Sequence, residues 1–410
     1  MRRRDASHTR RAPLVSGGPV LTPRTRAAVA LPAVVLVALT LRGPVSSVGP
    51  LLDELSTDAD LPSAAAALLT SLPLVCFGLV SPLAPVLSGR LGLHRAVLAG
   101  ATVLAVGLAL RGAGVAGLFV GTLLVGAGIA TGNVLLPAVA KADFGAHAPS
   151  VTGVVTACMA LSATLGAGLA QPLRQALDSP VASLVAWTAP AALAALVWWR
   201  TAPPHDPLAR DAHAVSVLPV LRDPVARAVT VFLGLQSLTF YTVLAWLPQV
   251  LRDDAGMSAV AAGVVLAVLA LLGVPVSLVV PRLAARRRDQ TWWVVAVAAP
   301  NVLGLVGLLL APAAAPEAWS LLIGLGTGAS FPLALTLVVL RSRDAAQTAR
   351  LSAAAQGVGY LLAATGPVVA GSLHDATGGW DAALAVLAAL VLVQVVVGLG
   401  AGRDRAVAER

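Results

Sequence analysis

Long apolar runs follow one another through almost the whole of this chain of 410 residues. A helix needs roughly 20 mostly apolar residues to cross a bilayer, because the hydrocarbon core is about 30 Å thick and each residue rises about 1.5 Å. Helices also satisfy their own backbone hydrogen bonds, which lipid cannot do. The chain is 58% hydrophobic and 11% charged, whereas soluble domains carry about 25% charged residues. We therefore predict an all-α membrane protein.

The apolar runs predict twelve spanning helices, and the polar, proline-rich gap at 201–223 divides them into six and six. This division predicts two pseudo-symmetric six-helix bundles. The expected spans are 27–52, 62–88, 95–112, 116–141, 150–174, 180–200, 224–251, 258–284, 291–312, 317–340, 350–374 and 380–402. The expected parts are a disordered basic cytoplasmic tail at 1–26, an N-terminal bundle at 27–200, a central cytoplasmic loop at 201–223, a C-terminal bundle at 224–402 and a cytoplasmic tail at 403–410.

The distribution of Lys and Arg predicts which side of the membrane each loop faces, because cytoplasmic loops collect these residues. With the N-terminus inside, the inner segments hold 24 of the 28 Lys and Arg residues, and Arg42 lies within a span. The outer segments hold three, Arg111, Arg174 and Arg252. We therefore predict a multi-pass protein of the inner (cytoplasmic) membrane with both termini in the cytoplasm. The net charge of +9 does not indicate nucleic-acid binding, since the basic residues are dispersed over loops.

Arg42 is the most informative residue, because a cation inside a span costs about 2.5–3.5 kcal/mol on insertion scales. Pro44 and Pro50 follow it, and each removes a backbone donor and frees carbonyls. In the functional interpretation, Arg42 faces a cavity and binds an anion or an electron-rich polar group. The alternative is that it bonds the freed carbonyls or reaches toward Asp53 and Glu54.

Three further polar residues, Asn133, Gln236 and Gln356, lie within about five residues of their helix centres, hence within roughly 7 Å of the midplane. Together with Arg42 they suggest a shared central site at one depth. Each is equally explained by a hydrogen bond between helices, worth about 0.6 kcal/mol on average. Tyr241 and Tyr360 are candidate cavity aromatics, and plain packing is the alternative for both.

Mid-span positions hold no Asp, Glu or His in the sequence. A proton relay usually needs a buried titratable group, so a buried-carboxylate antiport mechanism has no visible carrier. An arginine without a carboxylate favours an anion as its partner. No Cys/His cluster has metal-ligand spacing and no catalytic set lies at depth, so we expect no metal, no cofactor and no enzymatic activity.

Six groups of segments stand out along residues 30–400. They are Leu41-Arg-Gly-Pro, Val48-Gly-Pro-Leu, Leu69-Thr-Ser-Leu-Pro-Leu-Val-Cys-Phe77, Gly128-Ile-Ala-Thr-Gly-Asn-Val-Leu-Leu-Pro137 with Lys141, Gln236-Ser-Leu with Tyr241 and Trp246-Leu-Pro248, and Gln356-Gly-Val-Gly-Tyr360 with Gly366-Pro367. In these segments the chain resembles the major facilitator superfamily, and within it the cyanate/2-nitroimidazole transporter family. The resemblance implies a twelve-helix major facilitator fold, alternating access, and a cavity lined by the first, fourth, seventh and tenth helices.

The resemblance also implies a cytoplasmic gate in the loop after the second helix. The superfamily carries a Gly-x-x-x-Asp-Arg-x-Gly-Arg-Lys type of motif there, and Arg90, Gly92 and Arg95 fit it. Gly89 stands where the superfamily has its aspartate, and this puts in doubt the latch that the aspartate usually helps to form.

We therefore predict a secondary active transporter that moves a small anionic or polar solute, cyanate- or nitroimidazole-like, by alternating access. The partners expected are a small-molecule solute and the lipid bilayer, with a functional monomer and no nucleic acid. A multidrug exporter of the same superfamily is the first alternative, and it would favour a larger apolar cavity and usually a buried acid. A non-transporting receptor or scaffold is the second, and it would need an appended signalling domain. The substrate, the direction of transport and the coupling ion stay open.

Overall fold

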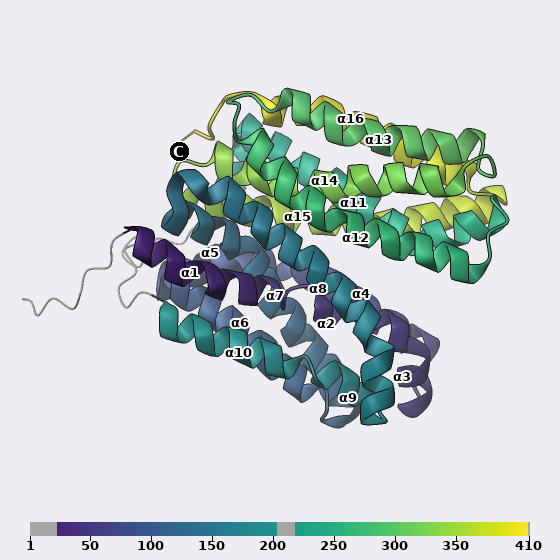
Figure 1. Cartoon of the computed structure of the whole chain (residues 1–410), viewed down its shortest axis with the longest axis horizontal. Helices are drawn as coiled ribbons and strands as arrows, with labels where there is room; N and C mark the ends of the chain where they lie inside the picture. The colour runs from purple at the N-terminus through teal and green to yellow at the C-terminus, as the bar shows by residue number, and fades with distance from the viewer. Residues whose placement is uncertain (1–22, 203–217, 409–410) are drawn as a thin grey trace, which may run out of the picture.

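The computed structural model describes residues 23–202 and 218–408, and over these residues it contains helices and no strands (Figure 1). Most of the predicted tail at 1–26 and of the predicted loop at 201–223 lies outside the described residues. The first helices are α1 (Pro23–Ala38), α2 (Gly43–Ser46), η1 (Gly49–Leu51), α3 (Leu52–Asp58), α4 (Ser63–Val80), η2 (Ser81–Leu83), α5 (Ala84–Leu91), α6 (Leu93–Leu110), α7 (Gly114–Phe144), η3 (Gly145–His147), α8 (Ala148–Leu177), α9 (Pro180–Val185) and α10 (Thr188–Thr201). The others are η5 (Leu218–Arg222), α11 (Pro224–Asp253), α12 (Ala259–Ala284), α13 (Thr291–Leu310), α14 (Pro316–Arg341), α15 (Ala345–Thr377) and α16 (Asp381–Gly402).

The number of membrane crossings agrees with the prediction from sequence. Among the described residues, eleven continuous helical stretches are long and apolar enough to cross a bilayer. One of them, Gly114–Leu177, is 64 residues long and contains both α7 and α8, which are separated by the short turn η3. Two helices in that stretch bring the total over the described residues to twelve crossings. The predicted twelve-helix fold is therefore confirmed.

Local sequence explains where many of the helices begin and end. Asp223, Ser258 and Asp344 precede α11, α12 and α15, and each side chain accepts a hydrogen bond from an amide in the first turn. Such caps satisfy donors that have no partner inside the helix. Gly378 ends α15 with φ +73° and Gly145 follows α7 with φ +49°, conformations that glycine adopts without steric cost.

The helices form two bundles, α1–α10 and α11–α16, which Figure 1 draws in purple to teal and in green to yellow. Within each bundle, neighbouring helices approach closely at glycines. A Cβ at Gly128 of α7 would lie 2.6 Å from the Gly100 carbonyl oxygen of α6, and one at Gly326 of α14 would lie 2.5 Å from the Asn301 Cβ of α13. Small residues allow such close backbone approach where lipid provides no hydrophobic drive for association. The predicted limits of the two bundles remain predictions.

The even number of crossings brings Pro23 and Val407 to one end of the molecule, which we call the Pro23 end. The opposite end carries α3 and α9, and we call it the Asp58 end. In Figure 1 the two bundles lie close together at the Pro23 end and separate toward the Asp58 end. The contacts follow this pattern, because a Cβ at Gly153 near the start of α8 would lie 2.8 Å from the Ser277 carbonyl oxygen of α12. The space between the bundles therefore widens away from the Pro23 end.

Candidate functional site

A break in the first helix places Arg42 at the middle of the bundle. The helix α1 ends at Ala38 and α2 begins at Gly43, and Arg42 is the N-cap residue of α2 with φ −127° and ψ −37°. Pro44 lies in the first turn of α2, where its missing N–H leaves no helical hydrogen bond unmade. We call the first membrane span, which contains α1 and α2, helix 1. The backbone of Arg42 is not helical, and its side chain is half-buried.

The guanidinium of Arg42 contacts two aromatic residues of the other bundle. Its Nη1 donates a hydrogen bond to the hydroxyl oxygen of Tyr241 on α11 at 3.3 Å. Its central carbon lies 5.3 Å from the ring centroid of Phe331 on α14, within the range of a cation–π interaction. In the part of the chain that the structure describes, Arg42 forms no salt bridge with a carboxylate. Among the described residues, the Arg42 guanidinium is therefore contacted by the hydroxyl of Tyr241 and the ring face of Phe331.

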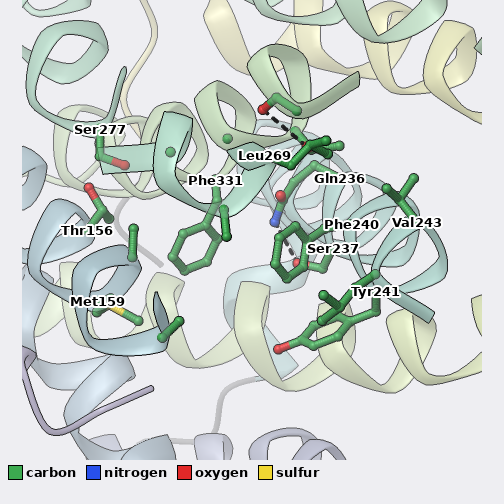
Figure 2. A pocket seen from close by; sticks show the side chains of 18 of the residues that line it. Thr156, Met159, Gln236, Ser237, Phe240, Tyr241, Val243, Leu269, Ser277 and Phe331 are labelled. Carbon is green, nitrogen blue, oxygen red and sulfur yellow. Dashed lines mark hydrogen bonds between the residues drawn. The ribbon is translucent and has the colours of Figure 1, made fainter. Parts of the chain in front are cut away.

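Arg42 lines a central cavity of about 130 Å³ between the two bundles. Figure 2 shows other side chains that line this cavity, among them Gln236 and Tyr241. Its walls come from α8, α11, α12, α14 and α15 and are mostly apolar, with a few polar groups such as Thr156 and Ser277. Three further residues predicted from the sequence, Gln236, Tyr241 and Tyr360, also line it. An apolar cavity with a few convergent polar groups is typical of a small-molecule site.

Two of these side chains present polar atoms that have no partner among the described residues. The Gln236 side chain is 2% exposed, and its Nε2 donates to the Leu233 carbonyl at 3.1 Å and to the Ser237 hydroxyl. Its Oε1 accepts no hydrogen bond from the described residues, and the buried hydroxyl of Tyr360 has no partner among them either. Buried polar groups are normally satisfied, so these atoms are available to a bound solute.

Aromatic rings surround the charged group. The rings of Phe240 and Tyr241 lie 5.2 Å apart at 79°, and those of Tyr241 and Tyr360 lie 6.4 Å apart at 69°. Phe77, from the first bundle, lies 5.3 Å from Tyr360. Edge-to-face arrangements of this kind leave ring faces and edges directed at the space between them. The cavity thus combines one cation with a partly aromatic wall.

The structure places Asn133 and Gln356 outside the cavity lining. Gln356 Nε2 donates to the backbone carbonyl of Asn133 at 2.9 Å and to the Ser352 hydroxyl at 2.8 Å. Gln356 precedes Tyr360 by about one turn of α15, so it lies about 6 Å closer to the Pro23 end than Tyr360 does. The Gln356 side chain thus joins α15 to α7, which corresponds to the helix–helix alternative stated from the sequence. The side-chain atoms of Asn133 are buried and have no hydrogen-bond partner among the described residues.

Comparison with known proteins then identifies the family. A family model described as the Major Facilitator Superfamily matches residues 34–364. The chain belongs to the major facilitator superfamily. It is 38% identical over 376 residues to the 2-nitroimidazole transporter of Escherichia coli (strain K12), covering 91% of this chain and 95% of that protein. It is 30% identical over 353 residues to the cyanate transport protein CynX of the same organism, covering 84% and 90%.

A solved structure supports the same fold. FucP, a major facilitator transporter crystallised in the outward conformation, matches with a TM-score of 0.71 and 15% identity, covering 90% of this chain and 98% of that one. The matches to the two Escherichia coli transporters confirm the predicted resemblance to the cyanate/2-nitroimidazole transporters. Together with the family model, they also confirm the prediction of a membrane-embedded transporter of small solutes. The residues that bind the solute are not identified by these comparisons.

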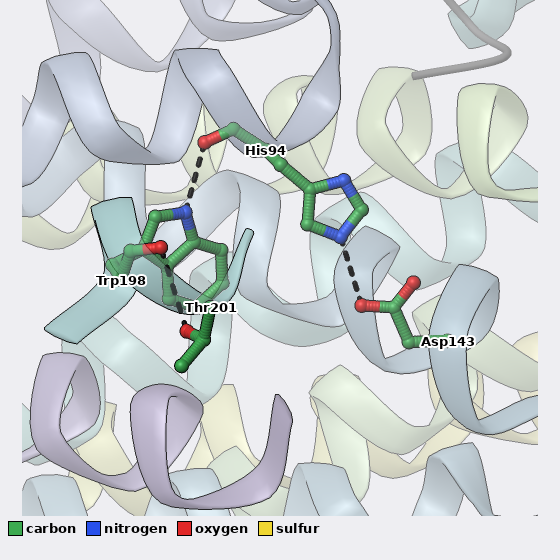
Figure 3. Close-up of polar contacts among 4 residues, drawn as sticks. All are labelled: His94, Asp143, Trp198 and Thr201. Carbon is green, nitrogen blue, oxygen red and sulfur yellow. Dashed lines mark hydrogen bonds and ion pairs between the residues drawn. The ribbon is translucent and has the colours of Figure 1, made fainter. Parts of the chain in front are cut away.

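The gate motif of the superfamily departs from its usual form in this chain. Gly92 joins α5 to α6 with φ +89°, while Arg90 and Arg95 are exposed. Just after this motif, His94 Nε2 lies 2.8 Å from Asp143 Oδ2 near the end of α7 (Figure 3). This contact joins the start of α6 to the end of α7 within the first bundle. The gating roles of Arg90, Gly92 and Arg95 remain predictions.

A contact between the bundles lies at the Pro23 end. Lys141, in the last turn of α7, donates from Nζ to the Val339 carbonyl near the end of α14 at 3.2 Å. The last carbonyls of a helix lack helical partners and carry partial negative charge. Lys141 of the first bundle thus binds the C-terminal end of α14 in the second bundle. This contact stabilises the close packing of the two bundles at the Pro23 end.

Replacing Lys141 with methionine should weaken this closure. A hydrogen bond from a charged group contributes about 1.5–3 kcal/mol, so the population open at the Pro23 end should rise roughly tenfold. Electron–electron distance measurements between spin labels at Leu91 and Arg286 would detect the longer distance. Arg200→Met, at an exposed position of the same end, is the control, and equal distance distributions for the two variants would contradict the prediction.

Two functional candidates were not predicted from the sequence. Phe331 carried no signal, because a phenylalanine in an apolar run is ordinary. Arg111 was counted among the outer segments with no role in the site. The structure places it at the end of α6, where it is 0% exposed and donates to the Pro44 carbonyl oxygen at 3.0 Å. Only the folded chain brings the end of α6 against the break in helix 1.

Proposed function

We propose that this chain transports a small planar anion, with the Arg42 guanidinium as the counter-charge in the central cavity. The observation that carries the proposal is the position of Arg42, which lines the cavity without a carboxylate partner among the described residues. A cation in a low-dielectric site attracts an anion far more strongly than it would in water. Arginine also presents a flat fork of donors that matches planar anions.

The relatives support the same solute class. Cyanate, named for one relative, is a small anion. The solute 2-nitroimidazole, named for another, is a flat ring whose N–H can ionise. Both fit a guanidinium beside aromatic rings, with Gln236 and Tyr360 as neutral hydrogen-bonding groups. The cavity of about 130 Å³ supports a small solute over the larger cargo of a multidrug exporter.

Transport would proceed by alternating access between the two bundles. The Lys141–Val339 and Gln356–Asn133 contacts hold the bundles together on the Pro23 side of the cavity. The concentration of Lys and Arg on that side supports its placement in the cytoplasm, so the structure would represent an outward-facing state in the inner membrane. We further propose a functional monomer with no enzymatic role.

A matched pair of solutes tests the charge of the cargo. We expect purified protein in liposomes to bind 2-nitroimidazole more tightly than 1-methyl-2-nitroimidazole, whose ring nitrogen cannot ionise. Because arginine stays protonated, affinity for 2-nitroimidazole should rise with pH as the solute loses its proton, while affinity for cyanate should stay level. Flux of labelled solute and thermal shift would report binding and transport. Equal affinity for the two imidazoles, without competition by cyanate, would overturn the proposal.

A further inference from the structure

The break in the first helix is held open by a serine from α8. In a continuous helix, the Gly43 amide would donate to the Leu39 carbonyl four residues earlier. Here the Gly43 N–H donates to Ser162 Oγ at 2.8 Å, and the Ser162 hydroxyl donates to the Leu39 oxygen at 2.6 Å. A side chain inserted into the helical ladder is an established cause of sharp kinks. Ser162 therefore replaces the hydrogen bond that would straighten the helix.

A buried arginine binds the other side of the same break. Arg111 Nη1 donates to the Pro44 carbonyl at 3.0 Å, and its Nε donates to the Thr122 hydroxyl at 3.2 Å. The Val48 amide, which would reach Pro44 in a continuous helix, donates instead to Val45. Arg111 also caps the C-terminal end of α6, where a positive charge is favourable. The guanidinium, together with the Ser47 hydroxyl at 3.3 Å, thus satisfies a carbonyl left free where the short helix α2 ends.

Packing leaves the broken segment little freedom. A Cβ at Gly43 would lie 2.5 Å from the Trp187 ring, and a Cβ at Gly166 would overlap the Gly43 carbonyl. The residue before this clamped glycine is Arg42, whose side chain reaches Tyr241 and therefore the other bundle. A change in the backbone at Gly43 would turn Arg42 away from these contacts.

We propose that Ser162 and Arg111 are positioning residues that hold the break in helix 1 and thereby aim Arg42 into the cavity. The inference rests on the proposed function, since it takes Arg42 as the group that binds the solute. Ser162 and Arg111 themselves do not line the cavity. Their effect on the solute passes through the direction of the Arg42 guanidinium.

A double-mutant cycle tests the coupling, with cyanate as the probe. Ser162→Ala should raise the cyanate dissociation constant roughly tenfold, the effect of losing one well-placed charged contact. In an Arg42→Ala background the same substitution should have no further effect, because residues that act through one another are not additive. Arg111→Met should behave like Ser162→Ala, and Arg111→Lys should recover part of the affinity. Ser183→Ala is the control, since its buried hydroxyl bonds the Ala170 carbonyl away from the break.

A second measurement reports the geometry without any solute. In a background with Cys76→Ala and Cys158→Ala, the variant Arg42→Cys should react readily with a water-soluble methanethiosulfonate reagent. Adding Ser162→Ala should slow this reaction several-fold as the helix straightens, while adding Ser183→Ala should not. Unchanged labelling together with unchanged cyanate binding in Ser162→Ala would overturn the positioning role. Cyanate binding that survives Arg42→Ala would instead overturn the proposed function, and the labelling rates would still decide the positioning role.

Discussion

Replacing Arg42 with alanine should lower binding and transport of an anionic solute by about 100-fold or more, because removing one partner of a buried ion pair costs about 3–5 kcal/mol. The substitution leaves the helix break intact, since its hydrogen bonds come from Ser162 and Arg111. Membrane insertion and thermal stability should therefore stay near those of the parent chain. Uptake of cyanate into proteoliposomes, at matched protein content, measures the effect.

Two further variants separate the charge of Arg42 from its shape. Arg42→Lys keeps a positive charge but loses the planar fork of donors, so it should retain partial activity. Arg252→Ala removes an exposed arginine from the end of α11 and should leave transport unchanged. Normal uptake by the alanine variant at position 42 would remove that residue from the mechanism, whereas an equal loss at position 252 would indicate a general surface-charge effect.

The second large effect is expected at Gly166. A Cβ there would overlap the Gly43 backbone, which the Trp187 ring also confines, so neither side can move easily. Overpacking of a tight contact costs about 1–3 kcal/mol and sometimes more. We expect Gly166→Ala to lower the unfolding temperature of the purified protein and Gly166→Val to lower it further.

Gly168 provides a matched control two residues along the same helix. A Cβ at this position meets nothing within 4 Å, and the residue is exposed. Alanine favours a helix over glycine by about 0.8–1 kcal/mol, so Gly168→Ala should be neutral or stabilising. Opposite signs at Gly166 and Gly168 would show that contact with helix 1 decides the effect. Equal destabilisation at both positions would contradict this explanation.

Polar positions show how far sequence alone could lead. Arg42 was conspicuous because a cation inside an apolar run is costly wherever it points. Asn133 and Gln356 had the right depth, yet they contact each other between α7 and α15. Depth follows from counting residues along a helix, whereas the direction of a side chain depends on which helices surround it. The sequence therefore predicts the depth of a polar residue, but it does not predict whether that residue faces the cavity.

The sequence by itself determined the twelve helices, because a bilayer accepts only long apolar segments that satisfy their own hydrogen bonds. It also placed one cation, Arg42, within an apolar span. The tertiary structure decided how that cation is used. Phe331 contacts Arg42 itself, while Ser162 and Arg111 bond its neighbours Leu39, Gly43 and Pro44, so three other helices contribute at sequence separations of 67 residues or more. Contacts across such separations follow from the packing of helices on one another, which local sequence does not encode.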